Sequence, residues 1–224
     1  MKIIKSKFEG VYWIENGKRR IATVNLVPGH MLFDEQIIKD KNKEYRIWNP
    51  YRSKWAAAIV KGIKEFPLKK GHKVLYLGAA SGQSASHISD IVGEEGKVFC
   101  VDISQRVMRD LIFICEKRKN MIPILADASN PSEYDFIGEV DFIFQDVAMP
   151  NQVEILTKNA KKFLKDSGYA MIAIKARSID VSAKPSEIFS RVENELSKEF
   201  KIIDKKRLEP YEMDHIVFLM KKIK

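Results

Sequence analysis

Val74–Gly82, with the sequence VLYLGAASG, is the stretch that decides the fold. Four consecutive apolar residues followed by a loop of small residues predict a buried strand that ends in a tight turn. A helix is predicted to start directly after the loop. Its unpaired N–H groups and positive dipole end favour an anionic group there, and the small side chains let a ligand come close. Strand, loop and helix in this order predict a ligand-binding turn of a parallel α/β sheet.

The surroundings of this loop discriminate between cofactors. Asp102 ends the next predicted strand, 20 residues after Gly82, where a carboxylate can accept both hydroxyl groups of a ribose. The spacing Gly78-x-x-x-Gly82 differs from G-x-G-x-x-G, which lets the backbone approach a pyrophosphate, so a dinucleotide is disfavoured. S-adenosylmethionine has a ribose and a carboxylate but no phosphate, and it suits this looser turn. Without Asp102, a turn whose glycines serve only packing would be the better interpretation.

Strands and helices alternate from Lys73 onward, which predicts an α/β fold with a parallel sheet covered by helices on both faces. Only the short link Glu209–Asp214 joins the last two strands, so the final strand is predicted to be antiparallel. This layout is typical of Rossmann-like methyltransferases. The predicted strands are Lys73–Leu77, Lys97–Asp102, Met121–Leu125, Val140–Gln145, Gly168–Ala176, Ile202–Arg207 and His215–Met220. Helices are predicted at Gln83–Val92, from Pro150 toward Phe163, and from Pro185 through Leu196.

The first 50 of the 224 residues differ in pattern from the rest. Phe8–Ile14 and Arg19–Asn25 are rich in β-forming residues and flank Asn16-Gly17, a strong hairpin signal. We therefore predict a small N-terminal β subdomain at residues 1–50 and a Rossmann-like methyltransferase domain at residues 51–224.

Charge and composition restrict the environment and the partners. A formal net charge of +9 and a pI near 9.4 suggest a polyanionic partner, although solvated lysines alone would give the same balance. The sequence shows no signal peptide and no apolar run that could span a membrane, so we expect a cytoplasmic protein with no membrane partner. Cys100 and Cys115 are predicted to be core thiols, and the four scattered histidines predict no metal site.

A second informative segment is Asn49–Ala58, with the sequence NPYRSKWAAA. Asn49 is expected to cap a helix and Pro50 to occupy its first position, which places Lys54 one turn in. Taken alone, Lys54 would be interpreted as an ordinary surface lysine.

Three further ionisable residues change that interpretation. Asp146 and Lys175 each end a buried strand, and His215, after the acidic Glu212 and Asp214, begins the last one. An ionisable side chain at the end of an apolar strand costs stability unless it is paired or functional. The alternative is a purely structural ion-pair network.

Methyl transfer to a hydroxyl requires removal of its proton. Partial burial and a neighbouring cation both favour the neutral form of a lysine. We therefore predict that Lys175 is the base, that Lys54 holds the substrate, that Asp146 orients both lysines, and that His215 closes the site or relays the proton. Lysines that stay charged and only position the hydroxyl would explain the same residues.

The motifs together resemble the fibrillarin family over nearly the whole chain. The motifs that carry the resemblance are Tyr45–Lys54, Tyr76–Gly82, Asp127-Ala128, Asp146–Gln152, Ile174–Asp180 and Glu209–His215. The form is similar to archaeal fibrillarin, because the Gly/Arg-rich N-terminal arm of the eukaryotic proteins is absent. Three places depart from the expected pattern: Gln83-Ser84 stands for a pair of threonines, Met149 for a glutamine and Trp55 for a leucine.

This resemblance implies an S-adenosylmethionine-dependent RNA 2′-O-ribose methyltransferase that acts on rRNA and tRNA within a box C/D guide RNA–protein complex. The implied partners are the guide RNA, a Nop-domain scaffold protein and a kink-turn-binding ribosomal-like protein. Guide pairing would choose the nucleotide, which suits a basic chain without an RNA-recognition module of its own.

The resemblance also implies which residues form the site. The implied catalytic residues are Lys54, Asp146, Lys175 and His215. The implied cofactor-binding residues are Tyr76, Gly78, Ala79, Ala80, Ser81, Gly82, Gln83, Ser84, Asp102, Ile103, Asp127, Ala128, Asp146 and Gln152. In this set Asp102 corresponds to the ribose-binding acid, and Asp127 with Ala128 to the adenine contact.

Three other functions remain as alternatives. A stand-alone RNA 2′-O-methyltransferase would act on naked RNA without partner proteins. A non-catalytic assembly component would keep the fold only for docking; Lys54, Asp146 and Lys175 argue against it, and failure to bind S-adenosylmethionine would favour it. A nicotinamide dehydrogenase is disfavoured by the missing third glycine of the dinucleotide pattern.

Overall fold

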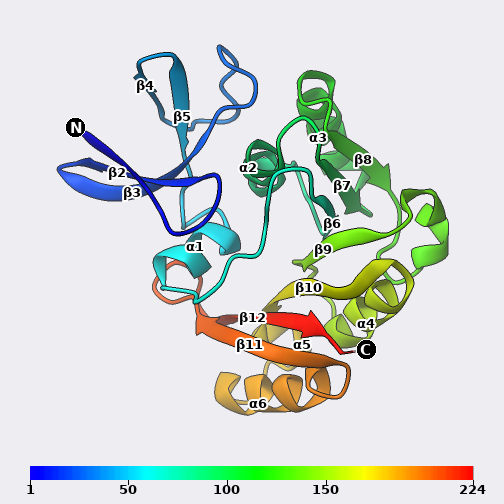
Figure 1. Ribbon diagram of the computed structural model, residues 1–224. Coiled ribbons are helices and arrows are strands. Elements are labelled where there is room, and N and C mark those ends of the chain that lie inside the picture. The colour runs from blue at the N-terminus through cyan, green and yellow to red at the C-terminus, as the bar shows by residue number, and fades with distance from the viewer. Residues whose placement is uncertain (224) are drawn as a thin grey trace.

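A computed structural model describes residues 1–223, which form two β-sheets with helices packed around the larger one (Figure 1). The smaller sheet is antiparallel, with the strand order β1-β2-β3-β5-β4. Its strands are β1 (Lys2–Lys5), β2 (Val11–Asn16), β3 (Lys18–Val24), β4 (Ile37–Asp40) and β5 (Lys43–Ile47). The predicted hairpin at Asn16-Gly17 is confirmed as β2–β3, whereas β1 and the β4–β5 hairpin had no clear sequence signal.

The larger sheet has the strand order β11-β12-β10-β9-β6-β7-β8. Its strands are β6 (Lys73–Leu77), β7 (Lys97–Asp102), β8 (Met121–Leu125), β9 (Val140–Gln145), β10 (Leu164–Lys175), β11 (Phe200–Arg207) and β12 (His215–Lys222). Strands β6 to β10 are parallel, and β12 runs antiparallel between β10 and β11. The predicted Rossmann-like fold and its antiparallel final strand are confirmed. The strand order reverses between β6 and β9, which is where such sheets bind ligands.

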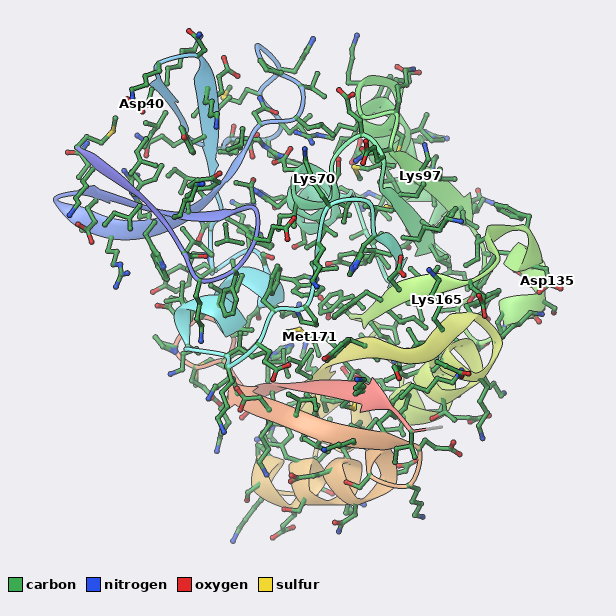
Figure 2. The ribbon with its side chains drawn as sticks, viewed as in Figure 1. Asp40, Lys70, Lys97, Asp135, Lys165 and Met171 are labelled. Atoms are coloured by element: carbon green, nitrogen blue, oxygen red, sulfur yellow. The ribbon has the colours of Figure 1, made fainter. Side chains whose placement is uncertain are left out.

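Helices cover both faces of the larger sheet (Figure 1). The helices of one face are α1 (Lys54–Val60), α2 (Gln83–Val92) and α3 (Gln105–Lys117). The other face has η1 (Pro131–Ile137), α4 (Gln152–Phe163), α5 (Ala176–Ile179) and α6 (Pro185–Leu196). Figure 2 shows Met171 of β10 in the interior between these layers, while Asp135 projects from the rim. Cys100 and Cys115 are buried in the core, as predicted, and burial raises the pKa of both thiols.

Two predicted helix starts are wrong. Helix α1 begins at Lys54 with Ser53 as its N-cap, so Asn49 and Pro50 belong to a preceding turn rather than to the helix. The Ser53 hydroxyl accepts a long hydrogen bond, 3.5 Å, from the N–H of Ala56. Lys54 is therefore the first residue of the helix rather than one turn inside it. Helix α4 begins at Gln152 after Asn151, two residues later than the Pro150 start.

The smaller sheet is attached to the rest of the molecule by a buried ionic network. Arg46 of β5 donates to Glu35 from Nε and Nη2, both at 2.8 Å, and to Asp90 of α2 from Nη1 at 2.8 Å. Arg118 donates to the same Asp90 at 2.6 Å. Burial opposes the charged form of Arg46, but Asp90 and Glu35 outweigh it and raise the pKa of the guanidinium. This network crosses the boundary that we proposed at residue 50, and that domain division remains a proposal.

No helix within residues 1–223 is both long enough and apolar enough to cross a membrane.

Replacing Arg46 by alanine is expected to lower the free energy of unfolding by about 3–5 kcal/mol, because Asp90 and Glu35 would be left as buried carboxylates without this partner. Arg106→Ala, at an exposed position of α3, is the matched control and should change it by less than about 0.5 kcal/mol. Urea unfolding of both variants measures the difference. Equal effects would show that the network contributes nothing specific.

Candidate functional site

The loop after β6 packs directly against the end of β9. Gly78 has φ +80°, and a Cβ atom there would lie 2.4 Å from the backbone oxygen of Asp146. Gly82 has φ +86°, and its Cβ would lie 2.6 Å from Leu111 Cδ1 of α3. Neither position accepts a larger residue without displacement of its neighbours. Gly78 therefore lets the small-residue loop pack against the strand end that carries Asp146, and Gly82 lets the end of the loop pack against α3.

Asp102, at the end of β7, holds this loop from the other side. Its Oδ2 accepts the backbone N–H of Ala80 at 2.8 Å, and its Oδ1 accepts that of Ser104 at 2.9 Å. Ala80 itself has φ +49°, so its backbone is turned into the left-handed region at this point. The carboxylate is fixed and only partly buried, and its remaining lone pairs can accept the hydroxyls of a ribose. The following residue, Ile103, is 67% exposed and offers an apolar surface beside it.

Asp127 and Ala128 follow β8, the next strand of the sheet. The Oδ1 of Asp127 accepts the N–H of Ser129 at 2.8 Å. The carbonyl oxygen of Ala128 accepts from Tyr134 Oη at 3.3 Å and from Asn159 Nδ2 at 2.9 Å. These bonds fix the loop beyond β8, so the loops after β6, β7 and β8 form a row in the order that an extended nucleoside cofactor requires.

Two buried amides mark the other side of the β6 loop. Gln152, the first residue of α4, is 1% exposed, and within residues 1–223 neither its Oε1 nor its Nε2 has a hydrogen-bond partner. Gln145, at the end of β9, donates to the carbonyl oxygen of Gln152 at 2.6 Å, while its own Oε1 has no partner in the described part of the chain. Unsatisfied buried amides are costly, and they fit a site whose polar ligand completes them. Gln145 was not predicted; the signal was a polar residue inside a buried strand next to Asp146.

Lys54 and Asp146 form the central ion pair of the site. Lys54 Nζ lies 3.0 Å from Asp146 Oδ2 and 3.7 Å from Glu212 Oε1. Glu212 in turn has an Oε2 atom 3.9 Å from Nδ1 of His215, which also lies 2.7 Å from the carbonyl oxygen of Met213. The structure thus brings three of the four predicted catalytic residues into one chain of contacts. Glu212 links them and was missing from the predicted set, although the acidic pattern before His215 contained its signal.

The floor beneath this pair is aromatic. Trp55, next to Lys54, packs on Phe144 with ring centroids 4.7 Å apart, and Tyr76 packs on Phe144 at 4.8 Å. Burial on this apolar floor raises the pKa of Asp146, against the opposing effect of Lys54. Burial also opposes the charge on Lys54, but Asp146 and Glu212 outweigh it and raise the pKa of the ammonium group. Lys54 is therefore held as a cation.

Tyr76 is buried below the loop rather than presented in it. Burial raises the pKa of its phenol well above the ordinary value, Asp146 adds to this, and a hydrogen bond with Ser84 opposes it. Tyr76 therefore remains a neutral hydrogen-bonding group. Ser84 and Gln83, in the first turn of α2, are partly exposed at the loop.

Lys175 lies on the neighbouring strand. It pairs with His215 in the β10–β12 register, and its side chain is exposed. Within residues 1–223 it forms no ion pair, so the expected orientation of both lysines by Asp146 is seen for Lys54 only. The arrangement as a whole can hold a nucleoside cofactor over the β6, β7 and β8 loops and present a fixed cation, a carboxylate and a second lysine to an incoming hydroxyl.

Comparisons with known proteins agree along the whole chain. The fibrillarin family model matches residues 3–224. The fibrillarin-like rRNA/tRNA 2′-O-methyltransferase of Pyrococcus furiosus is 53% identical over 225 residues, which cover 99% of each chain. Aeropyrum pernix fibrillarin, solved with natively bound S-adenosyl-L-methionine, superposes with a TM-score of 0.91 and 45% identity over 98% of each chain. Fibrillarin in a fibrillarin/Nop5p complex gives a TM-score of 0.88 and 40% identity over 98% of this chain and 100% of that one.

Gly78→Ala is expected to lower the free energy of unfolding by about 3 kcal/mol or more, because the new methyl group collides with the backbone of Asp146. Gly17→Ala is the matched control: Gly17 has φ +72° with open space around its Cβ, so only the backbone cost of about 1–2 kcal/mol remains. Chemical denaturation compares the two variants. A cost at Gly78 no larger than that at Gly17 would contradict the packing of the loop on β9.

Proposed function

This chain belongs to the fibrillarin family, and from that premise we propose that it is an S-adenosylmethionine-dependent 2′-O-methyltransferase of ribosomal and transfer RNA. The observation that carries the proposal is the Lys54–Asp146 pair, 3.0 Å apart, beside the glycine-constrained β6 loop. The curated relative carries this activity in its name, and a solved relative binds the cofactor. We place the reaction in the cytoplasm of an archaeal cell.

We also propose that the enzyme works in a box C/D complex in which guide pairing selects the nucleotide. The Nop5p complex of a solved relative supports a Nop-domain scaffold partner, and a kink-turn-binding protein and the guide RNA would complete the particle. The stand-alone enzyme and the non-catalytic assembly component are the rival functions that the experiments below separate from this one.

The cofactor residues have distinct tasks in this proposal. Asp102 accepts the ribose hydroxyls, the loop of Asp127 and Ala128 faces the adenine, and Gln152 with the first turn of α2 contacts the methionine end. Hydrogen bonds to the backbone already fix the carboxylates of Asp102 and Asp127, and the buried side-chain amide of Gln152 has no hydrogen-bond partner within residues 1–223. When bound, S-adenosylmethionine supplies an electrophilic methyl group.

The catalytic residues act on the hydroxyl. Lys54, kept cationic by Asp146 and Glu212, donates a hydrogen bond to the 2′-oxygen and stabilises the negative charge that develops on it. Lys175 in its neutral form accepts the proton of the 2′-hydroxyl, and His215 lies opposite it on β12 to close the site or pass the proton on. The alternative is that both lysines stay charged and only position the hydroxyl.

The function is tested by transfer of a labelled methyl group from S-adenosylmethionine to an RNA paired with a box C/D guide. The assay is run with and without the two partner proteins, and with a 2′-deoxy nucleotide at the guided position. We expect partner-dependent labelling that disappears in the deoxy control. Labelling without the partners would indicate a stand-alone enzyme, and cofactor binding with no labelling would indicate an assembly role or a different substrate.

Lys175→Arg separates the two roles of this lysine. Arginine keeps the charge but does not give up its proton, so if Lys175 is the proton acceptor kcat should fall by about 100- to 10,000-fold with little change in KM. Steady-state kinetics of this variant and of Lys175→Met are the measurement. Near-normal kcat in the arginine variant, with loss only in the methionine variant, would favour a positioning cation.

Glu212→Gln tests the carboxylate that links Lys54 to His215, and the measurement is the pH dependence of kcat/KM. The pKa of Asp146 is raised, so its ionised form is lost as pH falls through a value above the ordinary one, and Glu212 contributes to that rise. Removal of Glu212 should therefore move the acid limb of kcat/KM to lower pH. Glu209→Gln, in the same loop but paired with Arg207, is the control. An unshifted limb with uniformly reduced activity would indicate a structural role only.

A further inference from the structure

A groove of about 720 Å³ lies between the smaller sheet and the start of the larger domain. It is bordered by β3, the segment before β4, the connection from β5 to α1, and the first turns of α2. Figure 1 shows this junction above α1, where the N-terminal sheet meets α2. The function proposed above assigns no ligand to this groove.

The groove opens next to the catalytic pair. Its lining includes Ser53, which caps the helix that begins with Lys54, and Tyr211, which precedes Glu212. It also includes Gln83, the first residue after the cofactor loop. The groove therefore lies next to the Lys54–Asp146 pair, where a chain that presents a hydroxyl to this pair would continue.

Positive charge predominates along the groove. Four basic residues line it, Lys18, Arg19, Arg20 and Arg52, against the acidic Asp34 and Glu35. The charge of Glu35 is already paired with Arg46 beneath the surface. Lys18 and Arg52 are exposed and form no ion pair within residues 1–223. Their charges are thus available to an anionic ligand.

Unsatisfied donors and exposed rings complete the lining. Trp48 is 1% exposed, and within the described part of the chain its Nε1 has no acceptor; the same holds for Nε of Arg20. Tyr51 is 60% exposed and meets Tyr211 edge-to-face, with ring centroids 5.0 Å apart. Guanidinium groups and an exposed aromatic pair are the groups that contact phosphate and base.

We propose that this groove binds the sugar–phosphate backbone of the target RNA strand beside the methylated ribose. The inference rests on the proposed function and adds the path of the substrate. Contacts to the backbone position a strand without reading its sequence, which is what an enzyme directed by guide pairing requires. An acidic protein segment would use the same charges but would have no reason to continue into the catalytic site.

The test compares two charge-matched double variants. Lys18→Gln/Arg52→Gln removes two groove charges, and Arg191→Gln/Lys198→Gln removes two exposed charges at α6 and just after it, on the far side of the molecule in Figure 1. The probe is a fluorescently labelled target RNA, alone and paired with its guide. Its affinity for the isolated chain is measured over a range of salt concentrations, together with the affinities for S-adenosylmethionine and for the scaffold protein. KM and kcat are measured in the assembled complex.

The groove variant should bind RNA more weakly, and the slope of log affinity against log salt should decrease by about two, because two phosphate contacts are lost. Its KM for RNA should rise while kcat and cofactor affinity stay unchanged, and the control should match the wild type. Equal effects in both variants, or none, would overturn the proposal. Normal RNA binding with weakened binding of the scaffold protein would overturn it in favour of an acidic protein occupant.

The same measurements distinguish failure of this inference from failure of the proposed function. If the wild-type complex transfers no methyl group, the methyltransferase proposal fails whatever the groove variant does. If methyl transfer occurs but the two double variants behave alike, only the groove proposal fails.

Discussion

The close approach of Gly78 to the backbone of Asp146 is the constraint on which the site depends. The absence of a side chain at Gly78 lets the β6 loop rest on the end of β9, where a Cβ would lie 2.4 Å from a carbonyl oxygen. That contact places the proposed cofactor loop and the proposed catalytic carboxylate side by side, although Gly78 and Asp146 are 68 positions apart in the chain. Asp102 then fixes the far side of the loop through the N–H of Ala80. A transferred group and its acceptor can be aligned only if these two strand ends are held rigidly.

The electrostatics of the site follow from its aromatic floor. Asp146 lies two residues after Phe144, which packs against Trp55 and Tyr76, and burial makes the charge of Asp146 costly and raises its pKa. The same carboxylate, with Glu212, stabilises the charge on Lys54. Burial thus opposes the charge on Asp146 while Lys54 is held cationic, and such shifts are found both at functional sites and in structural ion pairs. A fixed cation in a partly dry site stabilises developing negative charge better than a solvated one.

The smaller sheet contributes a wall of the groove beside the proposed catalytic site. Arg46 fastens β5 to Asp90 of α2, and α2 begins at the cofactor loop, so the position of the N-terminal sheet is coupled to that of the loop. Buried guanidinium–carboxylate pairs of this kind specify one arrangement because any displacement leaves charges unpaired. The groove lined by Trp48 and Arg52 exists only because the two sheets are held in this relation.

The sequence by itself determined the local elements that have strong periodic or turn signals. The buried run before Gly78, the hairpin at Asn16-Gly17 and the antiparallel final strand follow from chain-local chemistry and link lengths, and the structure has all three. The start of α1 was misplaced, because Asn49-Pro50 and Ser53 are both acceptable helix starts and only packing selected the second. Tertiary structure alone decided that Glu212 joins Lys54, that the side-chain amide of Gln152 is buried without a hydrogen-bond partner among residues 1–223, and that a basic groove opens beside them. Those features depend on distances between segments far apart in the chain, and no local pattern contains such distances.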